Sequence, residues 1–276
     1  MKNNYCLYII ALIHVFCNVS LHGWHEIISP LSKVPGNLYT LEIIDSKSAW
    51  AVTFLNNDLE RSLVKYHDNQ WQSFAIPAQD PHLLATGDDG SLFIVARDEN
   101  YKYGLWQLVD NMWRPLGNFD STNGYPTNLI AINKNCALVA ICPCRGSTQI
   151  RSALYAWDNN KLIYIPNVLN HNAMSITDEG KIAADFTITK QLSDNNSLFN
   201  KILFHHNMPT HTITIVVKNN SQIWAYAGNT DTKLYCWNEK RQTWEIFTKN
   251  CDALMKGSRD KKIYYIDKQN KLFCYN

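Results

Sequence analysis

The sequence lacks the short motifs that mark the commoner enzyme classes. It contains no G-x-S-x-G nucleophile elbow, no P-loop, no H-E-x-x-H zinc motif and no glycine-rich dinucleotide fingerprint. A site assembled from scattered residues would escape such a search. A pair of glycosidase-type carboxylates among Glu60, Glu99, Asp120 and Asp231 is one example. The absences therefore count against an enzyme without excluding one.

An excess of charge of either sign is also missing. The 26 basic and 24 acidic residues leave a net charge of +2, and the two signs are interspersed along the chain. Nucleic-acid binding normally needs a basic stripe or patch that neutralises phosphates. The charge pattern therefore argues against a nucleic-acid partner.

The apolar run near the N-terminus, from Tyr5 to about Phe16, is short for a membrane helix, which needs about 20 residues. Lys2 precedes it, as in the basic region of a secretory signal. We expect residues 1–23 to be a cleaved signal peptide and residues 24–276 to be a single secreted or periplasmic domain with no membrane span. An uncleaved N-terminal anchor is the alternative.

A hairpin pattern recurs along the rest of the chain. Its clearest copy is Leu234–Phe247, in which large apolar residues alternate, a polar turn follows, and Trp244 opens the second strand. The copies recur about every 40 residues, which is typical of four-stranded propeller blades. They begin at Leu63, Leu105, Leu154, Ile202, Leu234 and Leu272.

Each hairpin follows another strand pair with a tight turn rich in Asn, Asp, Ser, Gly or Lys. The first strands of these pairs are expected at 38–44, 83–85, 129–132, 174–176, 212–217 and 253–255. The pattern therefore predicts an all-β, six-bladed β-propeller with four-stranded blades. The fourth blade is irregular, because no clear fourth strand separates Asn207 from Thr212.

The two ends of the domain complement each other. The last hairpin copy stops at Asn276 before its fourth strand, while Trp24–Ile27 resembles the missing strand. We therefore expect the N-terminal strand to complete the last blade, which would remove an open sheet edge.

The cysteines, tryptophans and histidines give weaker signals. Tryptophans at repeat positions, and Cys236 and Cys274, are expected to pack between blades.

For Cys142 and Cys144, two alternatives remain: a disulfide to another cysteine, or free thiols. The candidate partners for a disulfide are Cys136 and Cys251. The histidines His205, His206 and His211 have no carboxylate or cysteine at ligand spacing, so a solvated turn is favoured over a metal site. No metal and no cofactor is predicted.

The segment Thr86–Phe93, TGDDGSLF, partly resembles the aspartate box of sialidases. It occurs only once in that form, falls between two expected strands, and has no evident arginine triad beside it. We interpret it as turn chemistry.

The repeat as a whole, with its W-x-x-hydrophobic strand, D-x-G turn and L-Y-x-W-(D/N) strand, resembles the short-blade propellers of the tectonin and fucose-lectin kind. It contains neither paired kelch glycines nor recurrent Gly-His with Trp-Asp. The resemblance implies binding of glycans or microbial surface sugars. It identifies no sugar-binding residue, because no loop repeats a polar and aromatic triad.

In a propeller, the loops between the second and third strands lie on one face, and long loops on a rigid scaffold commonly carry function. These loops and the interblade loop at 118–126 contain the ligand-binding candidates Tyr101, Tyr103, Asp120, Tyr125, Arg145 and Asp231. The sequence thus favours a secreted, non-catalytic recognition module for a glycan or a cell-surface protein. The alternative is a secreted hydrolase or lyase with a site in the central channel, which requires acidic and basic residues to converge on the axis.

Overall fold

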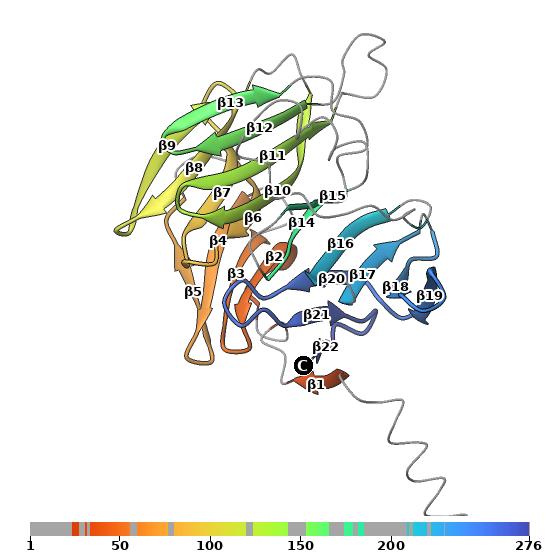
Figure 1. Cartoon of the computed structure of the whole chain (residues 1–276). Coiled ribbons are helices and arrows are strands. Elements are labelled where there is room, and N and C mark those ends of the chain that lie inside the picture. Colours follow the sequence, from red (N-terminus) through yellow and green to blue (C-terminus); the bar gives the residue numbers. More distant parts are fainter. Residues whose placement is uncertain are drawn as a thin grey trace, which may run out of the picture.

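A computed structural model of the protein consists of antiparallel β-sheets arranged around a centre (Figure 1). The structure describes residues 24–27, 31, 34–55, 60–76, 80–119, 124–142, 153–165, 174–178, 182–184, 209, 212–219, 222–228 and 230–275. No helix long and apolar enough to cross a membrane occurs among these residues.

Three of the sheets follow one another in the first part of the chain, each with its four strands in sequence order. The first sheet comprises β2 (Asn37–Asp45), β3 (Ser48–Leu55), β4 (Glu60–His67) and β5 (Gln70–Phe74). The second comprises β6 (Asp80–Thr86), β7 (Leu92–Arg97), β8 (Tyr103–Val109) and β9 (Met112–Asn118). The third comprises β10 (Tyr125–Asn133), β11 (Cys136–Cys142), β12 (Ala153–Asp158) and β13 (Lys161–Ile165).

The second part of the chain forms the remaining sheets. A two-stranded sheet pairs β14 (Met174–Ile176) with β15 (Ile182–Ala184). A four-stranded sheet follows, with β16 (Thr212–Asn219), β17 (Gln222–Ala227), β18 (Lys233–Asn238) and β19 (Thr243–Thr248). The last sheet contains β20 (Ala253–Lys256), β21 (Ile263–Ile266), β22 (Leu272–Tyr275) and the N-terminal strand β1 (Trp24–Ile27).

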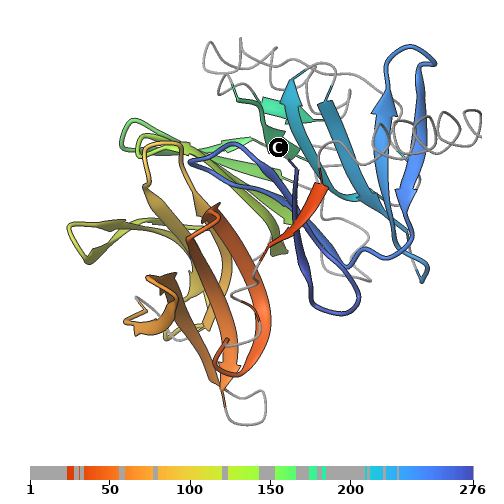
Figure 2. The ribbon, with the colours of Figure 1, turned by 90° about the horizontal axis from the view of Figure 1, so that it is seen from below.

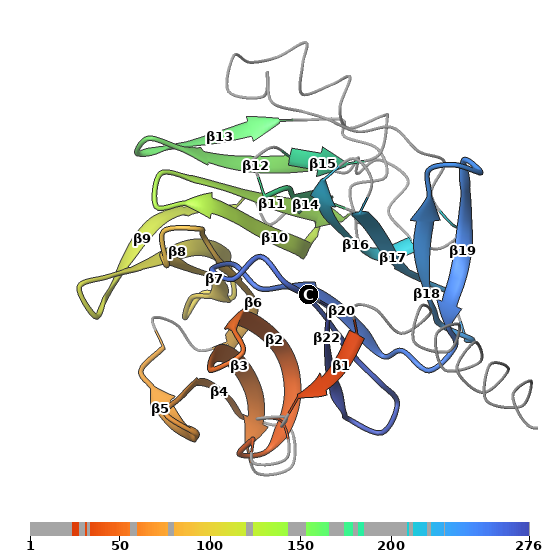
Figure 3. The ribbon, with the colours of Figure 1, turned by 60° about the horizontal axis from the view of Figure 1, so that its bottom comes forward.

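The first strands of the sheets form a closed ring. β2 contacts β6, β6 contacts β10, β10 contacts β14, β14 contacts β16, β16 contacts β20, and β20 contacts β2. Figure 3 shows the sheets radiating from this ring. The protein is therefore an all-β propeller whose inner strands surround a central channel.

The predicted count of six four-stranded blades is wrong. The described residues form five four-stranded blades, and the two-stranded sheet β14–β15 lies between the third and the next four-stranded blade in chain order. Its strands have three residues each, and the outer hairpin predicted to begin at Ile202 lies outside the described residues. The irregular spacing around Asn207 marks the same repeat.

The predicted closure by the N-terminal strand is confirmed. β1 pairs antiparallel with β22, with Trp24 opposite Tyr275 and Ile27 opposite Leu272. In Figure 2 the red β1 runs beside the dark blue C-terminal strands. The first and last segments of the domain therefore share one sheet, and the blade is completed by residues almost the whole chain apart.

Alternation along each strand explains how neighbouring blades pack. In β18, Leu234 and Cys236 pack against one cluster, with residues of the last blade. Tyr235 and Trp237 pack on the other face of the same sheet. A blade buried on both faces needs large apolar residues at consecutive positions, which is the pattern that the sequence repeats.

Residues at repeat positions are packed as expected. Trp50 and Trp157 are 4% exposed and Trp224 is 7% exposed. Cys274 is buried and Cys236 is half-buried. Cys236, Cys251 and Cys274 are free thiols. Of the alternatives left open by the sequence, a disulfide from Cys142 or Cys144 to Cys251 is therefore not formed; Cys144 itself lies outside the described residues.

The turn after β6 confirms the interpretation of the TGDDGSLF segment as turn chemistry. Asp89 accepts hydrogen bonds from the Ser91 amide at 3.1 Å and the Ser91 hydroxyl at 2.6 Å. Gly90 has φ of +81°, a left-handed conformation that favours glycine. Asp89 also accepts the Lys134 amide of the next blade at 2.8 Å, so this turn joins two blades.

Candidate functional site

The inner strands enclose a cavity of about 270 Å³ at the centre of the ring. Apolar side chains such as Leu83 and Ile130 contribute to its wall. Each inner strand, or the turn after it, also contributes a neutral polar residue: Thr40, Thr86, Asn128, Ser175, Thr214 and Ser258. A concave, partly apolar pocket with a few convergent polar groups is the usual form of a small-molecule site.

Glu42 is the carboxylate that faces this cavity from β2. Its Oε1 accepts the Thr86 amide at 3.1 Å and the Thr86 hydroxyl at 2.8 Å. Burial raises the pKa of Glu42 to about 7, although the two hydrogen bonds from Thr86 lower it. Thr86 Oγ1 also lies 2.7 Å from Ser258 Oγ, and because Thr86 has one hydroxyl proton, Ser258 donates to Thr86 while Thr86 donates to Glu42.

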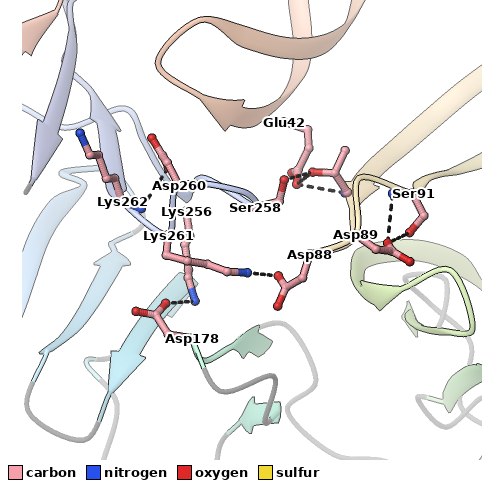
Figure 4. A network of polar contacts seen from close by, with 11 residues as sticks. Glu42, Asp88, Asp89, Ser91, Asp178, Lys256, Ser258, Asp260, Lys261 and Lys262 are labelled. Carbon is pink, nitrogen blue, oxygen red and sulfur yellow. Dashed lines mark hydrogen bonds and ion pairs between the residues drawn. The ribbon is translucent and has the colours of Figure 1, made fainter.

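Two ion pairs cross the channel near Glu42 (Figure 4). Lys256 of β20 binds Asp178, in the turn after β14, at 2.6 Å. Lys261, in the turn after β20, binds Asp88, in the turn after β6. In the ring, β20 is next to β2 and β16, so each lysine reaches past a neighbouring inner strand.

The turn after β20 is also fixed by its backbone to the end of β2. The amides of Ser258 and Arg259 donate to the carbonyls of Ile43 at 3.2 Å and Ile44 at 3.0 Å. Burial lowers the pKa of Lys256, and Asp178 opposes that effect. We call Glu42, Thr86, Asp88, Asp178, Lys256, Ser258 and Lys261 the channel-end network.

A second cluster lies at the opposite end of the inner strands. The first strands of three blades, β2, β6 and β10, begin at this end. The second and third strands of the first two blades meet there, where β3 leads into β4 and β7 leads into β8. Strand pairing sets Asp80 opposite Arg97, and Arg97 opposite Tyr103. We call this cluster the arginine–tyrosine face, and it contains Tyr39, Arg61, Asp80, His82, Arg97 and Tyr103.

Asp80 is the common partner of the two arginines on this face. Arg61 Nη1 lies 2.8 Å from Asp80 Oδ1, whereas Arg97 Nη1 lies 3.7 Å from Asp80 Oδ2. The guanidinium of Arg61 also stacks on the Tyr39 ring at 4.0 Å, and that of Arg97 on the Tyr103 ring at 4.6 Å. The rings therefore hold both arginines in place around one carboxylate.

His82 lies between the two tyrosines, with ring centroids 5.6 Å from Tyr39 and 5.5 Å from Tyr103. Its Nδ1 faces two donors, the Tyr39 hydroxyl at 2.7 Å and Arg61 Nη1 at 3.3 Å. Nδ1 is therefore the acceptor, and Nε2 donates to the Pro126 carbonyl at 3.1 Å. Burial, followed by the charge of Arg61, lowers the pKa of His82 and keeps the ring neutral.

Three residues predicted to bind ligand lie on or beside this face. Tyr103 is a member of the cluster. Tyr101, in the turn before β8, is 76% exposed and has φ of +59°. Tyr125 begins β10, is 40% exposed and precedes the carbonyl that His82 binds.

Asp231, another residue predicted to bind ligand, is not brought to this face. Asp231, in the turn before β18, is paired with Lys233 at 3.1 Å, which lowers its pKa. It belongs to the β16–β19 blade, which does not adjoin the β6–β9 blade in the ring. Asp120, Arg145 and the histidines His205, His206 and His211 lie outside the described residues.

Sequence reasoning missed most of the arginine–tyrosine face. Asp80 and His82 lie in β6, which begins three residues before the strand predicted at Leu83. Arg97 and Arg61 lie at strand ends and are the end residues of loops that the sequence interpretation considered functional, but they were not among its ligand-binding candidates. Extending each predicted strand by a few residues, and testing the charged residues at its ends, would have found them.

No protein-family model matches the chain, and no curated protein sequence matches it. Similar solved structures include the tricorn protease, with TM-score 0.58 and 10% identity over 88% of this chain. The chain spans 29% of that protease chain. Regucalcin from Agrobacterium tumefaciens, described as a calcium-binding protein, has TM-score 0.55 and 12% identity over 91% of this chain and 92% of its own. A luciferin-regenerating enzyme has TM-score 0.55 and 9% identity over 91% and 94%. At these identities the chain shares the propeller fold with these proteins, and the fold hosts many functions.

Proposed function

We propose that this protein is a recognition propeller that binds a glycan at the arginine–tyrosine face. The observation that carries the proposal is the position of Arg97. Its side chain is 38% exposed, stacks on Tyr103, and stands 3.7 Å from Asp80, which is too long for a hydrogen bond. Its Nε is buried without a hydrogen-bond partner. A guanidinium fixed in this way offers planar donors to a ligand without having to be ordered first.

The surroundings of Arg97 suit a sugar ring. Tyr101 lies in the turn that follows Arg97 and Tyr125 begins β10; both are exposed, and such rings have an apolar face and a polar hydroxyl. The resemblance to tectonin-like and fucose-lectin propellers supports a glycan over other ligands by analogy. We also propose that the protein is exported by its N-terminal segment, where a glycan of a cell surface would be accessible.

A glycan array tests this function with paired variants. Replacing Arg97 by glutamine, or Tyr101 by alanine, should weaken binding about tenfold or more, because each change removes a charged hydrogen-bond donor or an exposed stacking ring. The matched controls are Arg241→Gln and Tyr164→Ala. Arg241 lies in the β18–β19 turn, is 75% exposed and pairs with Glu245 of β19. Tyr164 is 46% exposed on β13.

The melting temperature separates binding from folding in this experiment. All four variants change exposed or half-exposed side chains, so they should melt within a few degrees of the parent protein. Equal binding by Arg97→Gln and Arg241→Gln would contradict a ligand site on this face. A blank array for folded parent protein would redirect the search toward a protein ligand.

A second candidate function, a hydrolase or lyase, is favoured by one observation in the channel. Glu42, with a pKa of about 7, faces the cavity, and both lysines and aspartates converge near it. A carboxyl group with a pKa near the working pH is suited to general acid–base chemistry. If a substrate panel reveals turnover, Glu42→Gln should reduce kcat more than 100-fold. Activity that survives this substitution would rule Glu42 out as the acid or base.

A further inference from the structure

Among the six described residues that define the arginine–tyrosine face, two arginines share one carboxylate. Arg61 and Arg97 are both cationic, and Asp80 is the carboxylate that lies between them. His82 adds no charge, since its Nδ1 accepts from Tyr39 and Arg61 and its Nε2 donates to Pro126. Two half-buried guanidinium groups that share one carboxylate favour an anionic ligand.

The two arginines differ in how many of their hydrogen-bond donors already have partners within the protein. Arg61 is 19% exposed and satisfies Asp80 at 2.8 Å, the Pro81 carbonyl at 3.1 Å and His82 at 3.3 Å. Arg97 is twice as exposed at 38%, and its nearest carboxylate oxygen is 3.7 Å away. Because the Nε of Arg97 is buried, its Nη groups are the donors that would bind a carboxylate from outside.

Asp80 both builds the site and competes with such a ligand. It positions Arg61 and, through the cross-strand pair, stands opposite Arg97. Its side chain is 29% exposed, so solvent and ligand reach the carboxylate that Arg97 faces. A ligand carboxylate would take the Arg97 donors that Asp80 leaves unused.

We propose that the arginine–tyrosine face recognises the carboxylate of an acidic glycan, with Arg97 as its direct partner and Tyr101 and Tyr125 against the sugar rings. This inference rests on the proposed glycan-binding function and narrows its ligand to acidic sugars. The exposed rings favour a glycan over an acidic peptide, because a sugar ring presents a flat C–H surface beside its carboxylate.

Binding calorimetry tests the proposal with three probes. They are a hyaluronan hexasaccharide, the same saccharide with its carboxylates reduced to alcohols, and hexaglutamate. The parent protein should bind the acidic saccharide at least tenfold more tightly than the reduced one, and Arg97→Gln should abolish that difference. Arg241→Gln, whose guanidinium also pairs with a carboxylate, should retain it.

Asp80→Asn adds an independent readout. The amide keeps an acceptor for Arg61 but removes the competing charge, so affinity for the acidic saccharide should rise several-fold, while affinity for the reduced one stays unchanged. A loss of affinity for both saccharides in a variant that melts normally would make Asp80 a positioning residue only and overturn its role as competitor.

The remaining outcomes also decide the matter. Equal affinity of the parent protein for both saccharides, lost in Arg97→Gln, would overturn recognition of the carboxylate and leave the glycan-binding function standing. Binding of hexaglutamate alone would overturn the assignment to a glycan. No binding of any probe would overturn the inference, and the array of neutral glycans would then decide the broader function separately.

Discussion

Replacing Trp24 by alanine should lower the free energy of unfolding by about 3 to 5 kcal/mol, as for other large aromatic side chains removed from packed sites. Trp24 packs against two aromatic residues of its own blade, Tyr265 at 4.8 Å and Tyr275 at 5.3 Å between ring centroids. It also packs against two of the preceding blade, Trp224 at 5.1 Å and Phe247 at 5.7 Å. The strand that closes the ring therefore also joins its last two four-stranded blades.

Chemical denaturation of the variant and of Glu26→Ala measures this effect. Glu26 lies on the same strand, but its side chain is 53% exposed and paired with Lys271 at 3.1 Å. An exposed ion pair contributes less than about 1 kcal/mol, so Glu26→Ala should be close to neutral. If both variants lost the same small amount, the closing strand would contribute little to stability. Trp24→Ala should also aggregate more readily, because a loosened β1 exposes the edge of β22.

The pairing of the N-terminal strand with the last blade could be predicted from the sequence, because the sequence shows both the incomplete blade and the strand that completes it. The last hairpin copy ends without a fourth strand, and Trp24–Ile27 has the pattern of the missing one. The blade count failed at the repeat near Asn207, where the repeat spacing is irregular. A periodic pattern indicates a blade only where each of its strands is long enough to show alternation.

Less of the candidate site could be predicted, since its members are distant in sequence. Tyr103 was found because it borders a long loop. The partners that make it chemically useful are set by strand register, which places Asp80 beside Arg97, and by packing, which places Arg61 beside Asp80. The near-neutral pKa of Glu42 comes from its burial beside Thr86, and no local pattern in the sequence reports that burial.

Replacing Glu42 by glutamine should make the protein more stable at neutral and alkaline pH. The carboxyl has an ordinary pKa of 4.5 when the chain is unfolded, and burial raises it to about 7 in the folded protein. Between these values the folded state keeps the proton that the unfolded state releases, so stability falls as the pH rises from about 4.5 to about 7. Above pH 7 the full penalty is present, and it amounts to about 3 kcal/mol for this shift.

Glutamine keeps the oxygen that accepts from Thr86 and cannot ionise, so the variant avoids this penalty. The difference in unfolding free energy between Glu42→Gln and the parent protein should approach about 3 kcal/mol at pH 8 and vanish near pH 4. His82 has a pH dependence of the opposite sign: its pKa is lowered in the folded protein, so it reduces stability as the pH falls below 6.5. Because His82 is present in both proteins, its contribution cancels in the difference between Glu42→Gln and the parent protein. Glu99→Gln, in the exposed turn before β8, controls for the loss of a surface charge. A difference that is the same at every pH would mean that Glu42 has the same pKa in the folded and the unfolded protein. A difference that grows with pH would mean that the propeller retains a destabilising carboxyl group in its channel, as proteins do where a group serves function rather than stability.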